Sequence, residues 1–172
     1  MAIARPESGE YAPYYGTYIS KVTAPDLARA LEAQLASTTS LLAGLTEAQA
    51  AYRYAPGKWT LREVIGHLAD AERIFAYRLL CIARGDTTPL PGFDENTYVP
   101  AGEFERRPIA SVAAEFGAIR MATLALLESL SADALARMGT ASGKPVSARA
   151  LAWIIAGHEI HHLGVIRERY LK

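Results

Sequence analysis

Three of the four histidines in this 172-residue chain lie between His158 and His162, and the fourth is His67. His158 and His162 continue an apolar 4-3-4 spacing that begins at Leu151 and Ile155, and this spacing is typical of the buried seam of a helix. Side chains four residues apart on a helix lie about 5–6 Å apart on one face, so both imidazoles can reach one ion at about 2.0–2.1 Å. The spacing therefore predicts two ligands of a metal site.

His67 lies on a second amphipathic stretch, between the apolar residues Val64 and Ala71. A single histidine on an apolar face is usually a hydrogen-bonded core residue, and this alternative remains open for His67 alone. Three buried imidazoles without partners would cost about 1–3 kcal/mol each, and a shared cation removes that cost. We therefore predict that His67, His158 and His162 bind one divalent metal ion and leave positions open for water or substrate. Zinc or nickel is expected first, with iron, cobalt or manganese as alternatives.

The run from His158 to His162 also matches the zinc-protease pattern His-Glu-x-x-His, in which the glutamate is the general base. Those enzymes generally take their third ligand from further along the chain, but only ten residues follow His162 and none is histidine, which argues against that class. Glu159 is rotated by about 100° from His158 and His161 by about 60°. We expect Glu159, His161 and Asp70 to lie behind or beside the ligands and to orient them.

Four amphipathic stretches position these residues. The helices expected are 23–44, 60–84, 108–130 and 147–172. Three of them begin at helix-start signals, namely the Thr60 to Glu63 capping box, Pro108 and Ser147, and Thr23 to Asp26 offers a similar start for the first. The loop 85–107 is long enough to be a crossover that lets the second and third helices run parallel. The fold class predicted is all-α, a four-helix bundle.

Residues 1–24 carry Tyr11, Tyr14, Tyr15 and Tyr18 among prolines and glycines without a helical period. This pattern predicts an irregular arm laid over a single domain that spans 1–172. The tyrosine rings could line a pocket, but packing of the arm onto the bundle explains them as well. Arg78 and Arg120 lie next to core seams, where they could bind an anionic substrate group or form ion pairs between helices.

The composition argues against several classes of protein. Eighteen basic and eighteen acidic residues give a net charge of zero, which does not favour a nucleic-acid partner. One cysteine and an amino terminus without the apolar core of a signal peptide predict a cytoplasmic protein without disulfides. We expect no membrane span, because charges interrupt the apolar stretches.

Four motifs carry a resemblance to a known family. They are Pro56-Gly-Lys-Trp59-Thr60, Val64-Ile-Gly-His67-Leu-Ala-Asp70, Pro89-Leu-Pro-Gly-Phe-Asp94 and Gly157-His158-Glu-x-His-His162. Over nearly its whole length, the chain resembles the DinB-like (YfiT/DinB) metal-binding bundles. The resemblance implies an up-down-down-up bundle with a divalent metal held by three histidines that map onto His67, His158 and His162. It also implies a homodimer. Leu41, Ile74 and Leu80 lie outside the buried seams of their helices and would therefore be available for the dimer contact.

Family members of established activity attach or use low-molecular-weight thiols, as bacillithiol transferases and mycothiol-dependent isomerases do. The resemblance therefore implies a metal-dependent transferase that acts with a small thiol, whose pKa the metal would lower. A hydrolase that uses metal-bound water is an alternative. A metal-binding or dimerisation module without turnover is the alternative from another class.

Overall fold

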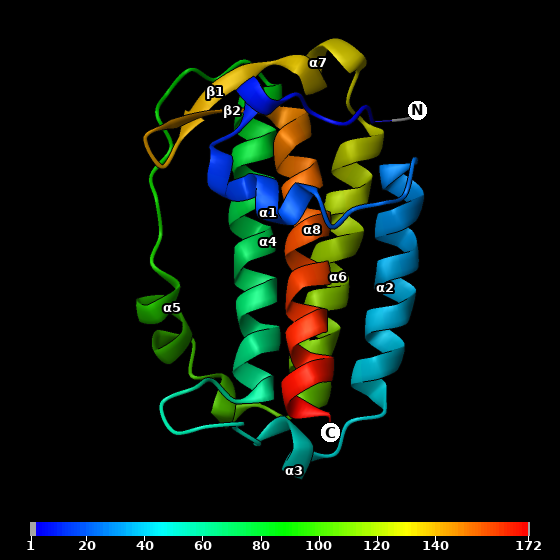
Figure 1. Cartoon of the computed structure of the whole chain (residues 1–172), viewed down its shortest axis with the longest axis vertical. Helices are drawn as coiled ribbons and strands as arrows, with labels where there is room; N and C mark the ends of the chain where they lie inside the picture. Colours follow the sequence, from blue (N-terminus) through cyan, green and yellow to red (C-terminus); the bar gives the residue numbers. More distant parts are fainter. Residues whose placement is uncertain (1–2, 172) are drawn as a thin grey trace.

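The computed structural model describes residues 3–171, and the ends of the expected arm (Met1 and Ala2) and of the last expected helix (Lys172) lie outside this range. Four long helices form the bundle, and 66% of the structure is helical. They are α2 (Leu27–Ala43), α4 (Leu61–Ala83), α6 (Ile109–Glu128) and α8 (Ala148–Val165). Figure 1 shows that α2 and α8 run in one direction while α4 and α6 run in the other. The predicted up-down-down-up bundle is confirmed.

The helix starts follow from local capping chemistry. Thr60 and Glu63 form a reciprocal capping box at the start of α4, in which the Glu63 amide donates to the Thr60 hydroxyl over 3.1 Å. Ser147 caps α8 by accepting from the Ala150 amide, and Pro108 precedes α6. These caps satisfy amides that have no partner within the helix. The predicted starts of these three helices are confirmed.

Two helix boundaries differ from expectation. Helix α2 begins at Leu27, four residues after the expected start at Thr23, because the side chain of Asp26 rather than Thr23 accepts from the Arg29 amide. Helix α8 ends at Val165, and one turn of π-helix, η4 (Ile166–Tyr170), continues it. In this turn Tyr170 donates from its hydroxyl to the carbonyl of Trp59 over 2.8 Å. The turn therefore joins the end of the last helix to the segment before α4.

The connectors contain more regular structure than the sequence indicates. The crossover between α4 and α6 includes α5 (Glu95–Ala101) and the 3-10 turn η3 (Phe104–Arg106), and α3 (Glu47–Ala50) follows α2. After α6 come α7 (Ala132–Ala136) and a hairpin of β1 (Met138–Ala141) and β2 (Lys144–Ser147). The two strands are antiparallel, with Met138 opposite Ser147. The link expected between the last two helices is therefore a short helix and a hairpin.

The amino-terminal arm is not irregular throughout, which corrects the expectation for this segment. It contains η1 (Ser8–Glu10), η2 (Pro13–Tyr15) and α1 (Gly16–Ile19), which crosses α8 in Figure 1. Glu10 accepts hydrogen bonds from Ser147 and Arg149, and the Trp153 indole donates to the carbonyl of Ala4 over 3.0 Å. Local turns are too short to show a helical period, and for this reason the sequence pattern missed them.

The core lies along the contact of α4 with α8, and α6 packs against both α4 and α2. Among the described residues, α6 alone is long and apolar enough to cross a membrane, with a mean hydropathy of 1.5 over 18 residues. It departs from the expectation that charges interrupt every apolar stretch. Its Arg120 is nevertheless fully buried and paired with Glu72 of α4, as in a helix packed within a bundle.

Candidate metal centre and adjoining cavity

Three imidazoles converge between α4 and α8. The Nε2 atom of His158 lies 3.2 Å from Nε2 of His67 and 3.1 Å from Nε2 of His162. One ring nitrogen from each histidine lies within 4.8 Å of the others. The long-range packing of α4 on α8 brings His67 to the other two, and the i,i+4 spacing on α8 places His158 and His162 on one face. The three residues expected to act together do lie together.

Burial keeps the three rings neutral. Desolvation lowers the pKa of His67 to about 4 and that of His162 to about 3. Burial also lowers the pKa of His158 well below its usual range, and the neighbouring His162 and His67 lower it further. A metal ligand must offer an unprotonated nitrogen, so these imidazoles are ready to bind a cation at neutral pH.

The arrangement fits a divalent ion. Two nitrogens that each lie 2.0–2.1 Å from one ion are about 2.9 Å apart at a right angle and about 3.4 Å apart at the tetrahedral angle. The two short nitrogen–nitrogen distances, 3.2 and 3.1 Å, fall between these values. Without a cation, each of these two close pairs of nitrogens could share at most one proton, as a hydrogen bond between the two rings. The donor set suits zinc, nickel, cobalt, copper or iron, and it does not select one of them.

Aromatic rings hold the cluster from several elements. The ring of Trp59 lies 5.1 Å from His67, and Phe75, two turns further along α4, lies 5.8 Å from His158. Tyr18 of the arm packs edge-on against His158 at 5.3 Å. The backbone of Tyr18 occupies the space next to Gly157 that any larger side chain would need. Close approach of α1 to α8 therefore depends on that glycine.

A cavity of about 370 Å³ adjoins the three histidines. This volume is in the range of small-molecule sites. Aromatic side chains dominate its wall, and its charged residues are Arg78 and Glu95. The lining residues are Tyr14, Tyr15, Tyr18, Trp59, His67, Phe75, Arg78, Phe93, Glu95, Ser142, His158, His161 and His162. Arm, crossover and hairpin all contribute, so the connectors complete a site whose histidines come from the bundle.

Arg120 and Glu159 do not line this cavity, and of the two alternatives for Arg120 the structure shows the ion pair between helices rather than a position beside a substrate. Nε and Nη2 of Arg120 each donate to a carboxylate oxygen of Glu72 over 2.8 Å. Nη1 lies 2.7 Å from Oε2 of Glu159, close enough for an ion pair but outside hydrogen-bond geometry. Thr38 donates to the other oxygen of Glu159 over 2.5 Å. Arg120 is therefore an interhelical ion-pair residue, because two buried carboxylates enclose its guanidinium.

Asp70, also expected beside the ligands, lies on another face of α4. Its carboxylate faces Arg73 at 3.5 Å and does not line the cavity. His161, in contrast, lines the cavity next to Tyr18, with 5.5 Å between ring centroids. Of the supporting residues predicted, only His161 borders the space that a ligand would occupy.

Several cavity residues were missed by sequence reasoning. Phe75 falls inside the expected helix 60–84 without a signal that separates it from a core residue, and Trp59 lies just before that helix. Phe93 and Glu95 lie in the crossover and Ser142 in the hairpin turn, where no periodicity marks them. The resemblance motifs contain Trp59 and Phe93 and were the only available signal for these two. For Ser142, the run of turn residues indicated a loop and nothing more.

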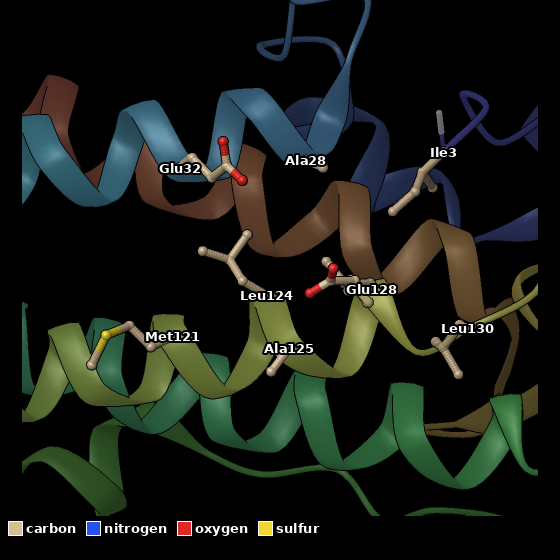
Figure 2. A pocket seen from close by; sticks show the side chains of 9 residues that line it. Ile3, Ala28, Glu32, Met121, Leu124, Ala125, Glu128 and Leu130 are labelled. Atoms are coloured by element: carbon tan, nitrogen blue, oxygen red, sulfur yellow. The ribbon is translucent and has the colours of Figure 1, made fainter. Parts of the chain in front are cut away.

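A larger cavity, of about 520 Å³, lies between α2 and α6 and is separate from the histidines. Figure 2 shows the exposed carboxylates of Glu32 on α2 and Glu128 on α6 beside Leu124. No histidine or cysteine lines it among the described residues. Its lining residues are Ile3, Ala28, Glu32, Met121, Leu124, Ala125, Leu127, Glu128 and Leu130. Of these two cavities, the smaller one is therefore the one that the histidine cluster lines.

Fold and site together define a four-helix bundle with a three-histidine cluster on the wall of an aromatic cavity. Residues 30–166 match the model of the DinB superfamily. The chain belongs to this superfamily, which confirms the resemblance noted from the motifs. No protein of curated function matched the sequence.

Solved structures share the fold at low sequence identity. YfiT from Bacillus subtilis, described as a probable metal-dependent hydrolase with an unusual four-helix bundle topology, has a TM-score of 0.75 and 19% identity, covering 96% of this chain and 90% of its own. A mycothiol-dependent maleylpyruvate isomerase has a TM-score of 0.66 and 16% identity, with 80% and 58% covered. The DinB-like protein YjoA from Bacillus subtilis has a TM-score of 0.58 and 21% identity, with 83% and 87% covered. At these identities the similarity shows the fold alone.

Proposed function

We propose that this chain is a divalent-metal-dependent enzyme that transfers or uses a low-molecular-weight thiol. The observation that carries the proposal is the convergence of three neutral imidazole nitrogens on the wall of a cavity large enough for a small molecule. A divalent ion bound there keeps its full charge and lowers the pKa of a thiol or water beside it. The similarity to a mycothiol-dependent isomerase supports a thiol as the ligand class.

In this proposal His67, His158 and His162 hold the ion. The aromatic wall, including Phe75 and Tyr18, excludes water from the reacting sulfur and strengthens electrostatic interactions there. Water exclusion also favours transfer of a group to the thiol over its hydrolysis. The ion pairs of Arg120 with Glu72 and Glu159 join α6 to α4 and α8, the two helices that carry the histidines.

The first experiment is metal analysis of tag-free protein. Wild type is expected to carry about one divalent ion per chain, and His67→Ala, His158→Ala and His162→Ala are expected to lose it. His161→Ala is the matched control, because this histidine lines the same cavity without joining the cluster. Full metal content in all three cluster variants would contradict the site.

The second experiment separates the reaction classes. With cobalt in the site, addition of a thiol such as glutathione, bacillithiol or mycothiol should produce a sulfur-to-cobalt charge-transfer band that His67→Ala lacks. A hydrolase is the second candidate, favoured by the description of YfiT. Metal-dependent hydrolysis of small esters or amides without any thiol band would replace the first proposal with the second. With neither outcome in fully metallated protein, a non-catalytic metal-binding module becomes the better account.

A cytoplasmic homodimer remains part of the proposal. Leu80 of α4 is 38% exposed, and Leu41 of α2 and Ile74 of α4 are half-buried, so apolar surface is available on these two helices. A two-fold contact would cover it. Light scattering at micromolar concentration measures the assembly directly, and a monomer would remove the dimer from the proposal.

A further inference from the structure

Arg78 is a buried cation without an acidic partner. Its side chain lines the histidine cavity although the residue is only 2% exposed. Nη2 donates to the carbonyl of Pro91 over 2.5 Å and to the hydroxyl of Ser142 over 3.2 Å. Within residues 3–171, no carboxylate oxygen forms an ion pair with this guanidinium, whereas the equally buried Arg120 meets two. Buried arginines are almost always paired with an anion.

The surroundings of Arg78 leave its charge uncompensated. The rings of Phe75 and Phe93 have their centroids 5.9 and 5.8 Å from the guanidinium carbon, which supplies only weak cation–π attraction. Burial lowers the pKa of Arg78, and the phenol of Tyr15 opposes this shift in part. An arginine stays protonated in proteins, so the positive charge must be balanced by another route.

The hairpin turn adds a second observation. Ser142 has a φ of 52° and Gly143 a φ of 71°, which are left-handed values. A two-residue turn between paired strands requires positive φ at both central positions, and Ala141 pairs with Lys144 on either side of these two residues. The Ser142 amide donates to the carbonyl of Leu90, so the turn is fixed to the crossover with its hydroxyl beside Arg78. The turn therefore positions the guanidinium at one end of the cavity.

Arg78 and the histidines are close enough for one small molecule to contact both. The ring of Phe75 lies 5.8 Å from the ring of His158 and 5.9 Å from the guanidinium carbon of Arg78. The cation is therefore no more than about 12 Å from a ring of the cluster, within a cavity of about 370 Å³. Glu95 is the only acidic residue on the wall and is exposed to solvent, which screens its charge.

We infer that the thiol taken up by this cavity carries an anionic group, with a carboxylate as its simplest form, which Arg78 binds while the sulfur faces the three histidines. This inference rests on the proposed function and specifies the class of its substrate. Arg78 is the specificity residue, and Ser142 positions it. The aromatic wall between the two ends accepts an apolar linker.

The test compares two ligands that differ only in charge. They are 6-mercaptohexanoic acid and 6-mercaptohexanamide, titrated into cobalt-loaded full-length protein, with calorimetry to measure affinity and absorption to follow the sulfur-to-cobalt band. Wild type is expected to bind the acid at least about tenfold more tightly than the amide, as charge-assisted hydrogen bonds to a buried guanidinium allow. Arg78→Gln should bring the two affinities to within about twofold.

Arg84→Gln is the matched control. Arg84 ends the same helix and is exposed, so its removal changes net charge equally and should leave the preference for the acid intact. Arg78→Lys should retain part of the preference. If Arg78→Gln does not fold, Ser142→Gly provides the test, because glycine suits the positive φ of the turn and the change removes the hydroxyl together with its Cβ. Ser142→Gly should lower the affinity for the acid more than the affinity for the amide.

Three outcomes overturn the inference: equal affinities in wild type, an unchanged preference in Arg78→Gln, or equal weakening of both ligands in the variants, which a purely structural arginine would cause. Failure of both ligands to bind at millimolar concentration also overturns it. Selective binding of the acid through Arg78 without a cobalt band supports the anion site and contradicts the thiol function. A cobalt band with both ligands, at equal affinity, supports the thiol function and contradicts the anion site.

Discussion

At the scale of single residues, the same side-chain type has two different roles in this protein. Arg120 and Arg78 are both buried, at 0% and 2% exposure. Arg120 is enclosed by the carboxylates of Glu72 and Glu159, while Arg78 faces a cavity. Burial raises the pKa of Glu159, and Arg120 and Thr38 hold it down in part. The two carboxylates give Arg120 a structural role. Among the described residues no carboxylate pairs with Arg78, so its guanidinium is available to a ligand.

Arg120→Leu is expected to lower the free energy of unfolding by about 3–5 kcal/mol, because it leaves two buried carboxylates without a cation. Urea unfolding at pH 7 measures this change. Arg29→Leu is the control for the same substitution at an exposed pair, since Arg29 and Asp26 have side-chain exposures of 86% and 41%. The control should change stability by no more than about 0.5 kcal/mol. Similar losses in both variants would show that the buried network does not stabilise the bundle.

At the scale of elements, α1 of the arm approaches α8 closely at one glycine. A Cβ atom on Gly157 would overlap the backbone carbonyl of Tyr18, whereas nothing lies within 4 Å of the equivalent position on Gly164. Because the obstacle is backbone, a side-chain rotation cannot relieve the overlap. The positions of Tyr14, Tyr15 and Tyr18 beside the cavity therefore depend on the absence of a side chain at Gly157 of α8.

Gly157→Ala is expected to move α1 away from α8, with a stability loss of about 1–3 kcal/mol. Amide hydrogen exchange in the segment 13–22 should accelerate, while the metal content stays near that of wild type because α4 and α8 hold the ligands. Gly164→Ala is the control and should stabilise α8 by up to about 1 kcal/mol without affecting the arm. Unchanged exchange in Gly157→Ala would mean that the arm is not held at this contact.

The elements also show how far the sequence could predict the structure. Local chemistry specifies the starts of α4 and α8, through Thr60, Glu63 and Ser147, and helical spacing brings His158 and His162 together. Such signals act within a few residues. The position of Tyr18 depends on Gly157, far along the chain, and the choice between ligand and ion pair for Arg120 depends on Glu72 of another helix. No local pattern encodes contacts of that kind.

At the scale of the whole molecule, an ion pair connects the amino-terminal arm to the start of the last bundle helix. Glu10 of the arm accepts from Ser147 over 2.6 Å and from Nε of Arg149 over 2.7 Å, and the hydrogen bond from Arg149 lowers its pKa to about 2. The carboxylate is only 14% exposed. Because the folded pKa lies below the unfolded one, the unfolded state binds more protons at acid pH. The contribution of Glu10 is therefore complete above about pH 4.5 and is lost as pH falls towards 2.

Glu10→Gln removes this contribution at every pH. The difference in unfolding free energy between wild type and variant should be about 2–3 kcal/mol at pH 6 and should shrink by more than half at pH 3. Chemical unfolding at the two pH values measures it. Glu128→Gln, at an exposed carboxylate, should show a small difference at both. A constant difference for Glu10→Gln between pH 6 and 3 would contradict the role of its charge.

The distance along the chain between the two ligand-bearing helices also has a consequence for how the protein matures. His67 and His158 are 91 residues apart in sequence, and α6 comes between α4 and α8 in the order of the chain. During synthesis α2, α4 and α6 emerge before α8, and non-local contacts of this kind form late and slowly. A nascent chain that has completed three helices still holds only one of the three imidazoles. Under the proposed function, metal uptake would therefore require α8 to be in place, and a chain without docked α8 would lack two of the three ligands.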